Sequence, residues 1–221
     1  MRVEWFGQSA FRIDGDGGSV FVDPFGEAVS SFAARGIAFD YPPIQTTAPD
    51  LLLVTHEHRD HNGVDAIPGE PPTLRSTAGK LESPLGEVVA VASEHDPEAG
   101  TARGPNTIFV FALDGIRIAH FGDFGQSELR EEQARAIGPI DLLFIPVGAG
   151  PTIGAEQATQ IAARLKPRWT VPMHYRTERI GFLEPPDDFL ALAAPTGVHR
   201  CEATAFDTGE VPEGIVVPAT P

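Results

Sequence analysis

The sequence predicts a layered α/β protein in which helices cover the faces of β-sheets. Short apolar runs come first as a meander and then alternate with helical segments, an order typical of this fold class. The 221 residues contain no internal repeat, no low-complexity segment and no linker-like stretch. With 42% hydrophobic residues, the chain can bury one core of ordinary size. We therefore expect a single domain that spans residues 1–221.

The N-terminal part is expected to form a β-meander. Its three strands are expected over residues 2–6, 9–13 and 19–23. The first two strands meet at Gly7-Gln8, and a turn rich in glycine and aspartate leads into the third. Pro24 follows Asp23 and ends the meander, because proline has no backbone N–H to donate to a ladder.

The segment from Ala28 to Pro49 has a weaker pattern. A short helix is expected over residues 28–34, followed by a proline-rich loop. Long loops in compact domains often carry function. We therefore expect this segment to form a lid or a wall of the substrate site.

Strands and helices alternate over the rest of the chain. Further strands are expected at Leu51–Val54 and at residues 87–92, 107–113, 116–119, 141–147 and 169–173. Helices are expected at residues 127–137, 152–166 and 187–194, with at most a short helical turn at 63–67. Ser127 is the expected N-cap of the first helix, and Pro167 ends the second.

A cluster of candidate metal ligands follows the apolar strand Leu51–Val54. Three of the seven histidines of the chain and one aspartate lie within six positions: His56, His58, Asp60 and His61. Imidazole nitrogens and carboxylate oxygens bind zinc, manganese and iron. In extended backbone, side chains two positions apart share a face, so His56 and His58 can bind one ion. Asp60 and His61 lie past the bend and can turn towards a second position.

Three more candidate ligands follow other apolar strands. His95 comes after residues 87–92, Asp123 after 116–119, and His174 after 169–173. If these strand ends meet at one sheet edge, they add to the first cluster and bring together five histidines and two aspartates. Such a set suits two adjacent metal ions that each keep an open position.

Together these residues resemble the metallo-β-lactamase-fold hydrolases. The resemblance is carried by His56-x-His58-x-Asp60-His61, by His95, by Asp123 in a Gly-Asp pair and by His174 after Pro-Met. Within that superfamily the chain is similar to the branch that includes L-ascorbate-6-phosphate lactonase. Three further stretches match that branch: Trp5-Phe-Gly-Gln-Ser-Ala-Phe11, Asp23-Pro24 and Pro172-Met-His-Tyr175. The resemblance implies a four-layer αββα sandwich with a metal site at one edge of the sheets.

The resemblance also implies which residues bind two divalent ions, with zinc the first expectation and manganese or iron the alternatives. The first ion would be bound by His56, His58 and His95. The second would be bound by Asp60, His61 and His174, with Asp123 bridging the two ions. Asp23 would orient a ligand imidazole by accepting its other N–H. Relatives usually carry histidine where this chain has Gln8, which can hydrogen-bond but cannot transfer a proton.

The expected function is hydrolysis of a small ester, lactone or phosphoester by a metal-bridged hydroxide. Asp60 is the candidate catalytic residue, because it would orient the nucleophile or carry a proton. A non-catalytic metal-binding or regulatory module of the same fold is the main alternative. A di-iron redox domain is the other alternative, and His58 argues against it, because the redox pattern has glutamate at that position.

Composition limits the partners and the compartment. The net charge of −15 opposes bulk binding to nucleic acid or to anionic membranes, although bound cations would allow a small anionic substrate. The chain lacks an apolar run long enough to span a membrane, and we expect a cytoplasmic protein. The single cysteine, Cys201, excludes an intramolecular disulfide. The oligomeric state has no signature in the sequence.

Three further polar residues lie outside the proposed cluster. His120 is expected at a strand end facing the core or a neighbouring loop, and His199 on the surface. Arg176 follows His174 closely. It is a candidate contact for an anionic substrate, with a structural role as the equal alternative.

Overall fold

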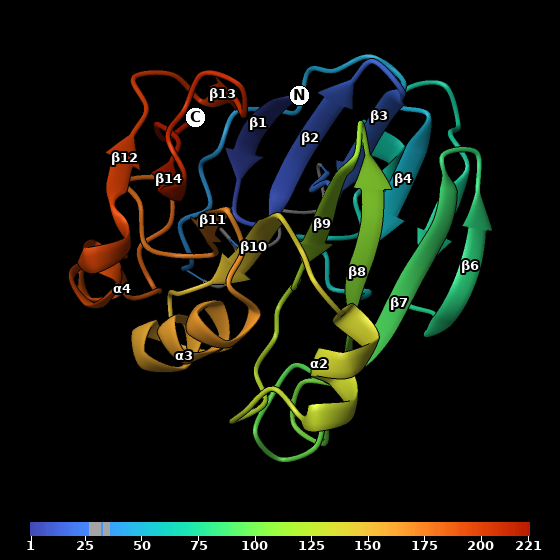
Figure 1. Ribbon diagram of the computed structural model, residues 1–221. Helices are drawn as coiled ribbons and strands as arrows, with labels where there is room; N and C mark the ends of the chain where they lie inside the picture. Colours follow the sequence, from blue (N-terminus) through green and yellow to red (C-terminus); the bar gives the residue numbers. More distant parts are fainter. Residues whose placement is uncertain (27–31, 33–35) are drawn as a thin grey trace.

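Two β-sheets packed face to face form the centre of the molecule (Figure 1). The computed structural model describes residues 1–26, 32 and 36–221. One sheet has six strands and the other has eight. The helix expected at residues 28–34 falls outside the described residues, apart from position 32. The mixed α/β class predicted from the sequence is confirmed.

The six-stranded sheet contains the N-terminal meander. Its strands are, in spatial order, β13 (Ala205–Asp207), β1 (Arg2–Gly7), β2 (Ala10–Gly15), β3 (Gly18–Val22), β4 (Leu51–Val54) and β5 (Thr73–Arg75). β1, β2 and β3 pair antiparallel as a meander does, whereas β3, β4 and β5 pair parallel. The expected three-strand meander is therefore confirmed.

The eight-stranded sheet supplies the other face of the sandwich. Its strands are, in order, β12 (Val198–Arg200), β14 (Gly214–Val217), β11 (Trp169–Met173), β10 (Leu142–Pro146), β9 (Ile116–His120), β8 (Pro105–Leu113), β7 (Gly86–Glu94) and β6 (Gly79–Ser83). β9, β10 and β11 run parallel, so their carboxyl ends lie at one end of the sheet. β7 and β8 are antiparallel partners on the other side of β9.

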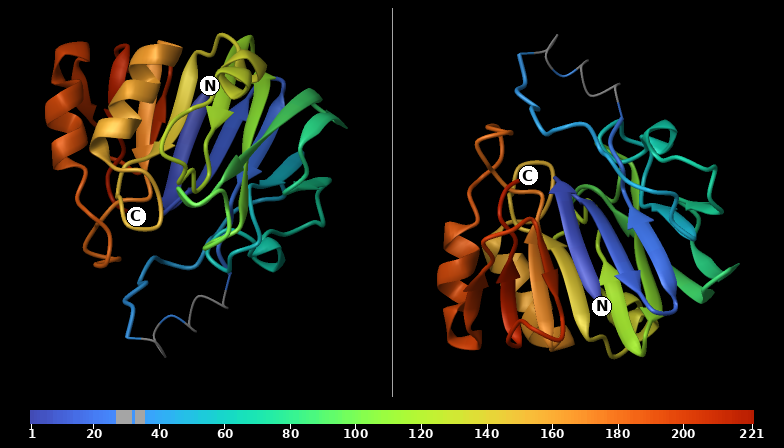
Figure 2. Two further views of the ribbon diagram at one scale, coloured as in Figure 1. Left: turned by 90° about the horizontal axis from the view of Figure 1, so that it is seen from below. Right: turned by 90° about the horizontal axis from the view of Figure 1, so that it is seen from above.

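The α-helices that the structure describes lie over the outer face of the larger sheet (Figures 1 and 2). They are α2 (Glu131–Ile137), α3 (Ala155–Leu165) and α4 (Asp187–Ala193). α2 contacts β7, while α3 contacts both β10 and α4. The described residues also form two 3-10 turns, η2 (Val64–Ala66) and η3 (Ala194–Thr196). Among the described residues, no helix has the length and apolar character needed to cross a membrane.

Two helices begin later than the sequence predicts. The prediction of Ser127 as an N-cap is wrong, because α2 begins at Glu131 and is capped by Arg130 in extended conformation. The Arg130 backbone N–H donates to Gln133 Oε1 at 3.0 Å, and this bond fixes the start of the helix. The second helix was predicted from residue 152 but begins at Ala155, with Gly154 as its N-cap.

Each side of the six-stranded sheet has its own apolar cluster. Alternate residues of β4 belong to different clusters: Leu51 and Leu53 pack between the sheets, while Leu52 packs on the outer face. The inner cluster includes Phe11 and Phe144, whose ring centroids are 4.6 Å apart across the two sheets. The outer cluster is completed by residues from loops: Phe25, Tyr41, Ile180 and Leu183. Loops thus cover the outer face of the smaller sheet where the structure describes it.

Candidate metal centre

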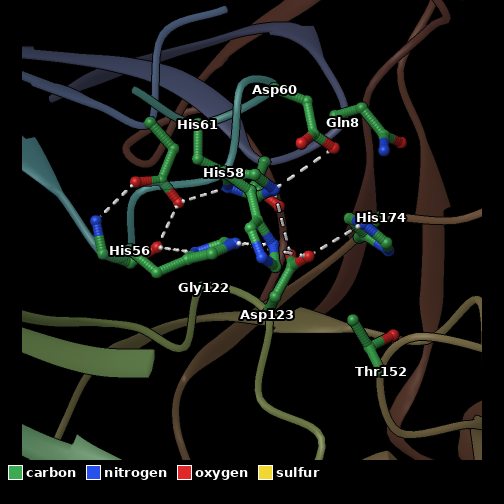
Figure 3. A network of polar contacts seen from close by, with 12 residues as sticks. Gln8, His56, His58, Asp60, His61, Gly122, Asp123, Thr152 and His174 are labelled. Atoms are coloured by element: carbon green, nitrogen blue, oxygen red, sulfur yellow. Dashed lines mark hydrogen bonds and ion pairs between the residues drawn. The ribbon is translucent and has the colours of Figure 1, made fainter. Parts of the chain in front are cut away.

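The predicted ligands come together at one end of the sandwich, from both sheets (Figure 3). β4 of the smaller sheet leads into the segment from His56 to His61. The larger sheet supplies the rest: His95 follows β7, Asp123 follows β9 and His174 follows β11. The expectation that all four strand ends share one sheet edge is wrong. Among the described strands, β4 pairs with β3 and β5 of the smaller sheet, so the cluster lies between two sheets.

Asp123 is at the centre of the cluster. Its Oδ2 lies 3.1 Å from His95 Nε2, 3.2 Å from His174 Nε2 and 3.8 Å from His56 Nε2. Its Oδ1 lies 3.2 Å from His61 Nε2. The carboxylate itself is almost completely buried. Four imidazoles from three parts of the chain therefore face a single carboxylate.

The other ligand candidates divide into two groups around this carboxylate. In each group the possible ligand atoms lie within 4.8 Å of one another. One group is His56, His58 and His95, and the other is Asp60, His61 and His174. His58 is exposed and Asp60 is half-buried, whereas the remaining four are buried. This division is the one that the sequence resemblance implies.

Asp23 also approaches the cluster, but both of its carboxylate oxygens already accept hydrogen bonds. The Thr55 backbone N–H donates to Asp23 Oδ1 at 2.7 Å, and the Thr55 hydroxyl donates to Oδ2 at 2.7 Å. His61 Nδ1 lies 2.9 Å from the same Oδ2. Asp23 could be grouped with His56 and His61 by distance alone. Its hydrogen bonds instead make Asp23 a partner that orients the His61 ring by contacting Nδ1, the ring nitrogen that points away from the cluster.

Thr55 and Pro151 hold two further imidazoles from outside the cluster. The Thr55 oxygen lies 3.0 Å from His56 Nδ1 and, having donated its own proton to Asp23, can accept the proton of that nitrogen. The Pro151 carbonyl lies 2.9 Å from His95 Nδ1 and can only accept. Both arrangements put the ring proton on Nδ1 and turn a lone pair on Nε2 towards the cluster. Sequence reasoning missed both residues, although Thr55 is a buried polar residue directly before His56.

The loop that carries Asp123 is fixed by a buried amide and a glycine. Asn106 Oδ1 accepts the Asp123 backbone N–H at 3.0 Å, and Asn106 Nδ2 donates to the Phe121 carbonyl at 2.8 Å. Gly122 has φ +54°, and a Cβ built there would lie 2.5 Å from Asn106 Oδ1 and 2.6 Å from Thr55 Oγ1. Only glycine leaves enough room at this position. Sequence reasoning also missed Asn106.

The charges of the cluster favour a bound cation. Burial opposes ionisation of Asp123, but the surrounding imidazoles, His174 first, lower its pKa well below the usual range. Burial also opposes ionisation of Asp60, and His61 outweighs it to lower that pKa. Burial would lower the pKa of His61, yet Asp123 and then Asp60 raise it well above its usual value. The carboxylates therefore stay charged and attract positive charge to this point.

The buried atoms without hydrogen bonds also fit a metal site. His61 Nε2 and Asp123 Oδ1 have no hydrogen-bond partner among the described residues, although they lie 3.2 Å apart. Two ligands at 2.0–2.2 Å from one tetrahedral zinc ion would be about 3.4 Å apart. Burial lowers the pKa of His56 well below its usual value, and that of His58 to a smaller degree. Both rings are therefore neutral, as metal ligation requires.

The remaining polar candidates lie outside the cluster. His120 is buried, its Nε2 lies 3.0 Å from the Ser9 carbonyl, and its Nδ1 accepts the Gly122 N–H at 3.2 Å. The expectation that His120 faces the interior is thus confirmed. His199 lies half-buried on β12. The Arg176 side chain donates a hydrogen bond to the Leu183 backbone carbonyl.

Comparisons with known proteins identify the family. A family model described as a beta-lactamase superfamily domain matches residues 2–174. A UPF0173 metal-dependent hydrolase of Thermococcus onnurineus (strain NA1) is 32% identical over 204 residues, covering 80% of this chain and 85% of the relative. A relative of the same description from Thermococcus kodakarensis is 29% identical over 241 residues, covering 95% of this chain and 98% of its own.

A solved structure gives the same result for the fold. It is that of a Thermotoga maritima protein assigned to the zinc-dependent hydrolases of the metallo-β-lactamase superfamily. The two structures superpose with a TM-score of 0.74 at 27% identity, covering 98% of this chain and 97% of the other. The sandwich fold, the matched sequence and the histidine–aspartate cluster agree with one another. The chain belongs to the UPF0173 metal-dependent hydrolases of the metallo-β-lactamase superfamily.

Proposed function

We propose that this metal-dependent hydrolase uses two divalent ions to cleave a small ester, lactone or phosphoester. The observation that carries the proposal is the position of Asp123 between two groups of ligand atoms. Each of its oxygens faces imidazole nitrogens, with distances from 3.1 to 3.8 Å. A carboxylate in that position can bridge two ions, whereas a single-ion site would need only one of the groups.

Seven residues would hold the two ions. His56, His58 and His95 would bind the first ion, and Asp60, His61 and His174 the second, with Asp123 shared. Nitrogen and oxygen donors suit zinc foremost, with manganese or iron as alternatives. When bound, such ions lower the pKa of a water to about 7 and polarise the substrate oxygen.

The chain's own residues prepare this site for hydrolysis. Asp23, Thr55 and the Pro151 carbonyl hold the outer nitrogens of three imidazoles, which fixes the direction of their lone pairs. Asp60 is half-buried and its pKa is lowered, so it is an ionised carboxylate that would accept a hydrogen bond from the attacking water. Its side chain is 15% exposed, in contrast to the buried Asp123. Asp60 is therefore better placed than Asp123 to orient the attacking water, although its lowered pKa makes it a weak proton acceptor.

The test is a metal analysis joined to a substrate screen. Purified protein should contain about two divalent ions per chain and hydrolyse at least one member of a panel of lactones, phosphate monoesters, phosphodiesters and carboxylic esters. A chelator should abolish the activity, and adding back zinc or manganese should restore it. One ion per chain at saturation would contradict the binuclear site. Full metal occupancy without hydrolysis of any panel member would favour the alternative of a non-catalytic metal-binding module.

A further inference from the structure

Gln8 is a buried residue whose side chain has no hydrogen-bond partner in the described part of the chain. It lies in the turn between β1 and β2 and is completely inaccessible to solvent. Neither its amide nitrogen nor its amide oxygen makes a hydrogen bond to any described residue. Buried amides are almost always hydrogen-bonded, because leaving one unpaired is unfavourable. An unpaired amide at a metal site therefore calls for a functional explanation.

The backbone of Gln8 is held firmly against His174. Gln8 has φ +49°, which is unusual for a residue with a side chain. Its carbonyl accepts the indole N–H of Trp5 at 3.0 Å and the backbone N–H of His174 at 3.4 Å. Figure 3 shows the Gln8 side chain on the His174 side of the cluster. The fold thus keeps a strained turn in place beside one ligand of the proposed second ion.

His174 differs from the other buried imidazoles of the cluster. His56, His61 and His95 each have a partner within 3.0 Å of their outer nitrogen, Nδ1. His174 Nδ1 is buried and has no partner among the described residues. When Nε2 binds a metal, the ring proton must be on Nδ1, and that N–H needs an acceptor. His174 therefore lacks the support that its three neighbours have.

We propose that Gln8 is the positioning residue of His174: its amide oxygen accepts the Nδ1–H of His174 when Nε2 binds the second ion. One interaction would then satisfy two buried atoms that lack partners. The inference rests on the proposed two-ion site and extends it, because it names the residue on which affinity for the second ion depends. Gln8 cannot transfer a proton, so it acts here through geometry alone.

Ser9 is the competing acceptor. Its hydroxyl is buried and also has no partner among the described residues. Unlike Gln8, it is not linked to His174 by any backbone hydrogen bond that the structure records. Ser9→Ala is therefore a matched control, because it removes a neighbouring unpaired polar group without touching Gln8.

The experiment measures metal binding to the full chain after removal of metal with a chelator. Zinc is titrated calorimetrically into the wild type and into the Gln8→Met, Gln8→Glu and Ser9→Ala variants. Methionine keeps the length of glutamine but removes the acceptor, whereas glutamate keeps an acceptor oxygen. An Asp60→Ala variant, which loses a ligand of the second ion, identifies which of the two affinities belongs to that ion.

Gln8→Met should weaken the second ion by about 10–100-fold and leave the first unchanged. Gln8→Glu should recover most of that loss, and Ser9→Ala should bind both ions as the wild type does. Equal weakening of both ions by Gln8→Met, or no weakening, would overturn the proposal. So would a loss at the second ion caused by Ser9→Ala, because Ser9 would then be the acceptor.

A melting experiment gives an independent readout. Because methionine buries no unpaired amide, chelator-treated Gln8→Met should melt a few degrees above chelator-treated wild type. Lower stability of Gln8→Met without metal would indicate a structural role and overturn the assignment. Metal affinity and melting are measured without any substrate. A protein that binds two ions and hydrolyses nothing would therefore contradict the proposed function while leaving the role of Gln8 tested.

Discussion

Four imidazole nitrogens lie within 3.8 Å of the Asp123 carboxylate, and they differ in how strongly the chain fixes them. Removing the charge of Asp123 while keeping its shape tests its proposed bridging role. In Asp123→Asn we expect bound metal to fall from two ions to one or fewer, and hydrolysis to fall by more than about 100-fold, the upper range for loss of a supporting residue. Elemental analysis and initial rates on a substrate found in the screen measure both effects.

The control for this substitution is Asp188→Asn. Asp188 is an exposed carboxylate in the first turn of α4 and loses the same single charge. Both metal content and rate should equal those of the wild type. If Asp123→Asn keeps two ions and full activity, a bridging role for Asp123 is wrong.

Gly122 allows the loop that carries Asp123 to pass close to Asn106, because glycine has no side chain. An added Cβ would lie 2.5 Å from Asn106 Oδ1, whereas Gly115 has a similar positive φ and open space around it. Gly122→Ala should therefore destabilise the protein by about 1–3 kcal/mol more than Gly115→Ala, which bears the backbone penalty alone. Chemical denaturation measures the difference. Gly122→Ala should also weaken metal binding, and equal effects of the two substitutions would show that the close approach is tolerated.

At the scale of secondary-structure elements, the sequence predicts what is local and apolar. β4, β10 and β11 are short runs of four or five buried residues, and the sequence predicts the ends of each to within two residues. The glycine- and aspartate-rich turn of the N-terminal meander is also local, and the sequence predicts it as well. The ligand spacing around His56 is local too, which is why the sequence alone reveals this part of the cluster.

The missed elements depend on partners that are distant in the sequence. Five strands were not predicted: β5, β6, β12, β13 and β14. β5, β6 and β12 lie at sheet edges, and β13 has only three residues. Their conformation is set by the strand they pair with, so propensity alone gives a weak signal. The sequence gives no signal for Thr55, Asn106 and Pro151 as supporting residues for the same reason, because their contacts arise only when separate segments meet.

The start of α2 depends on one buried side chain. Gln133 exchanges hydrogen bonds with the amide of Gln126, accepts the Arg130 N–H and donates to the Ala92 carbonyl at 2.8 Å on β7. Gln133→Met would leave these buried groups unpaired, and we expect a loss of roughly 3 kcal/mol in the free energy of unfolding. Gln160→Met on the exposed face of α3 should change it by less than about 0.5 kcal/mol. Urea denaturation compares the two, and equal small effects would contradict the capping role.

At the scale of the whole molecule, Tyr41 connects three separate segments. Its ring packs over Gly7, where a Cβ would lie 2.4 Å away, and against Trp5 with centroids 6.3 Å apart. Its hydroxyl pairs with Thr177 Oγ1 at 2.9 Å, beyond β11. Tyr41 thereby holds together the β1–β2 turn, the loop before β4 and the segment after His174. These three segments lie at the end of the sandwich that carries the histidine–aspartate cluster.

The ionisation of tyrosine reports on this closure, because the chain has only two tyrosines, Tyr41 and Tyr175. Burial raises the pKa of Tyr41 from 10 to about 12, although hydrogen bonds from Thr177 and the Gln8 backbone oppose it. Burial raises the pKa of Tyr175 as well. In the folded protein the neutral phenol is favoured, so the stability linked to Tyr41 is complete below pH 10 and is lost as pH rises from 10 towards 12.

Two units of pKa correspond to about 3 kcal/mol of stability for Tyr41. Absorbance at 295 nm should therefore show no tyrosinate at pH 10 in the native protein, while the urea-unfolded chain should be half ionised there. Tyr41→Phe should reduce the fall in stability between pH 10 and 12. The ionisation of Tyr175, whose pKa is also raised, would then be the remaining absorbance signal. Native tyrosines that ionise near pH 10 would mean that solvent reaches this end of the sandwich. In that case the turn that holds Gln8 beside His174 would be open to solvent.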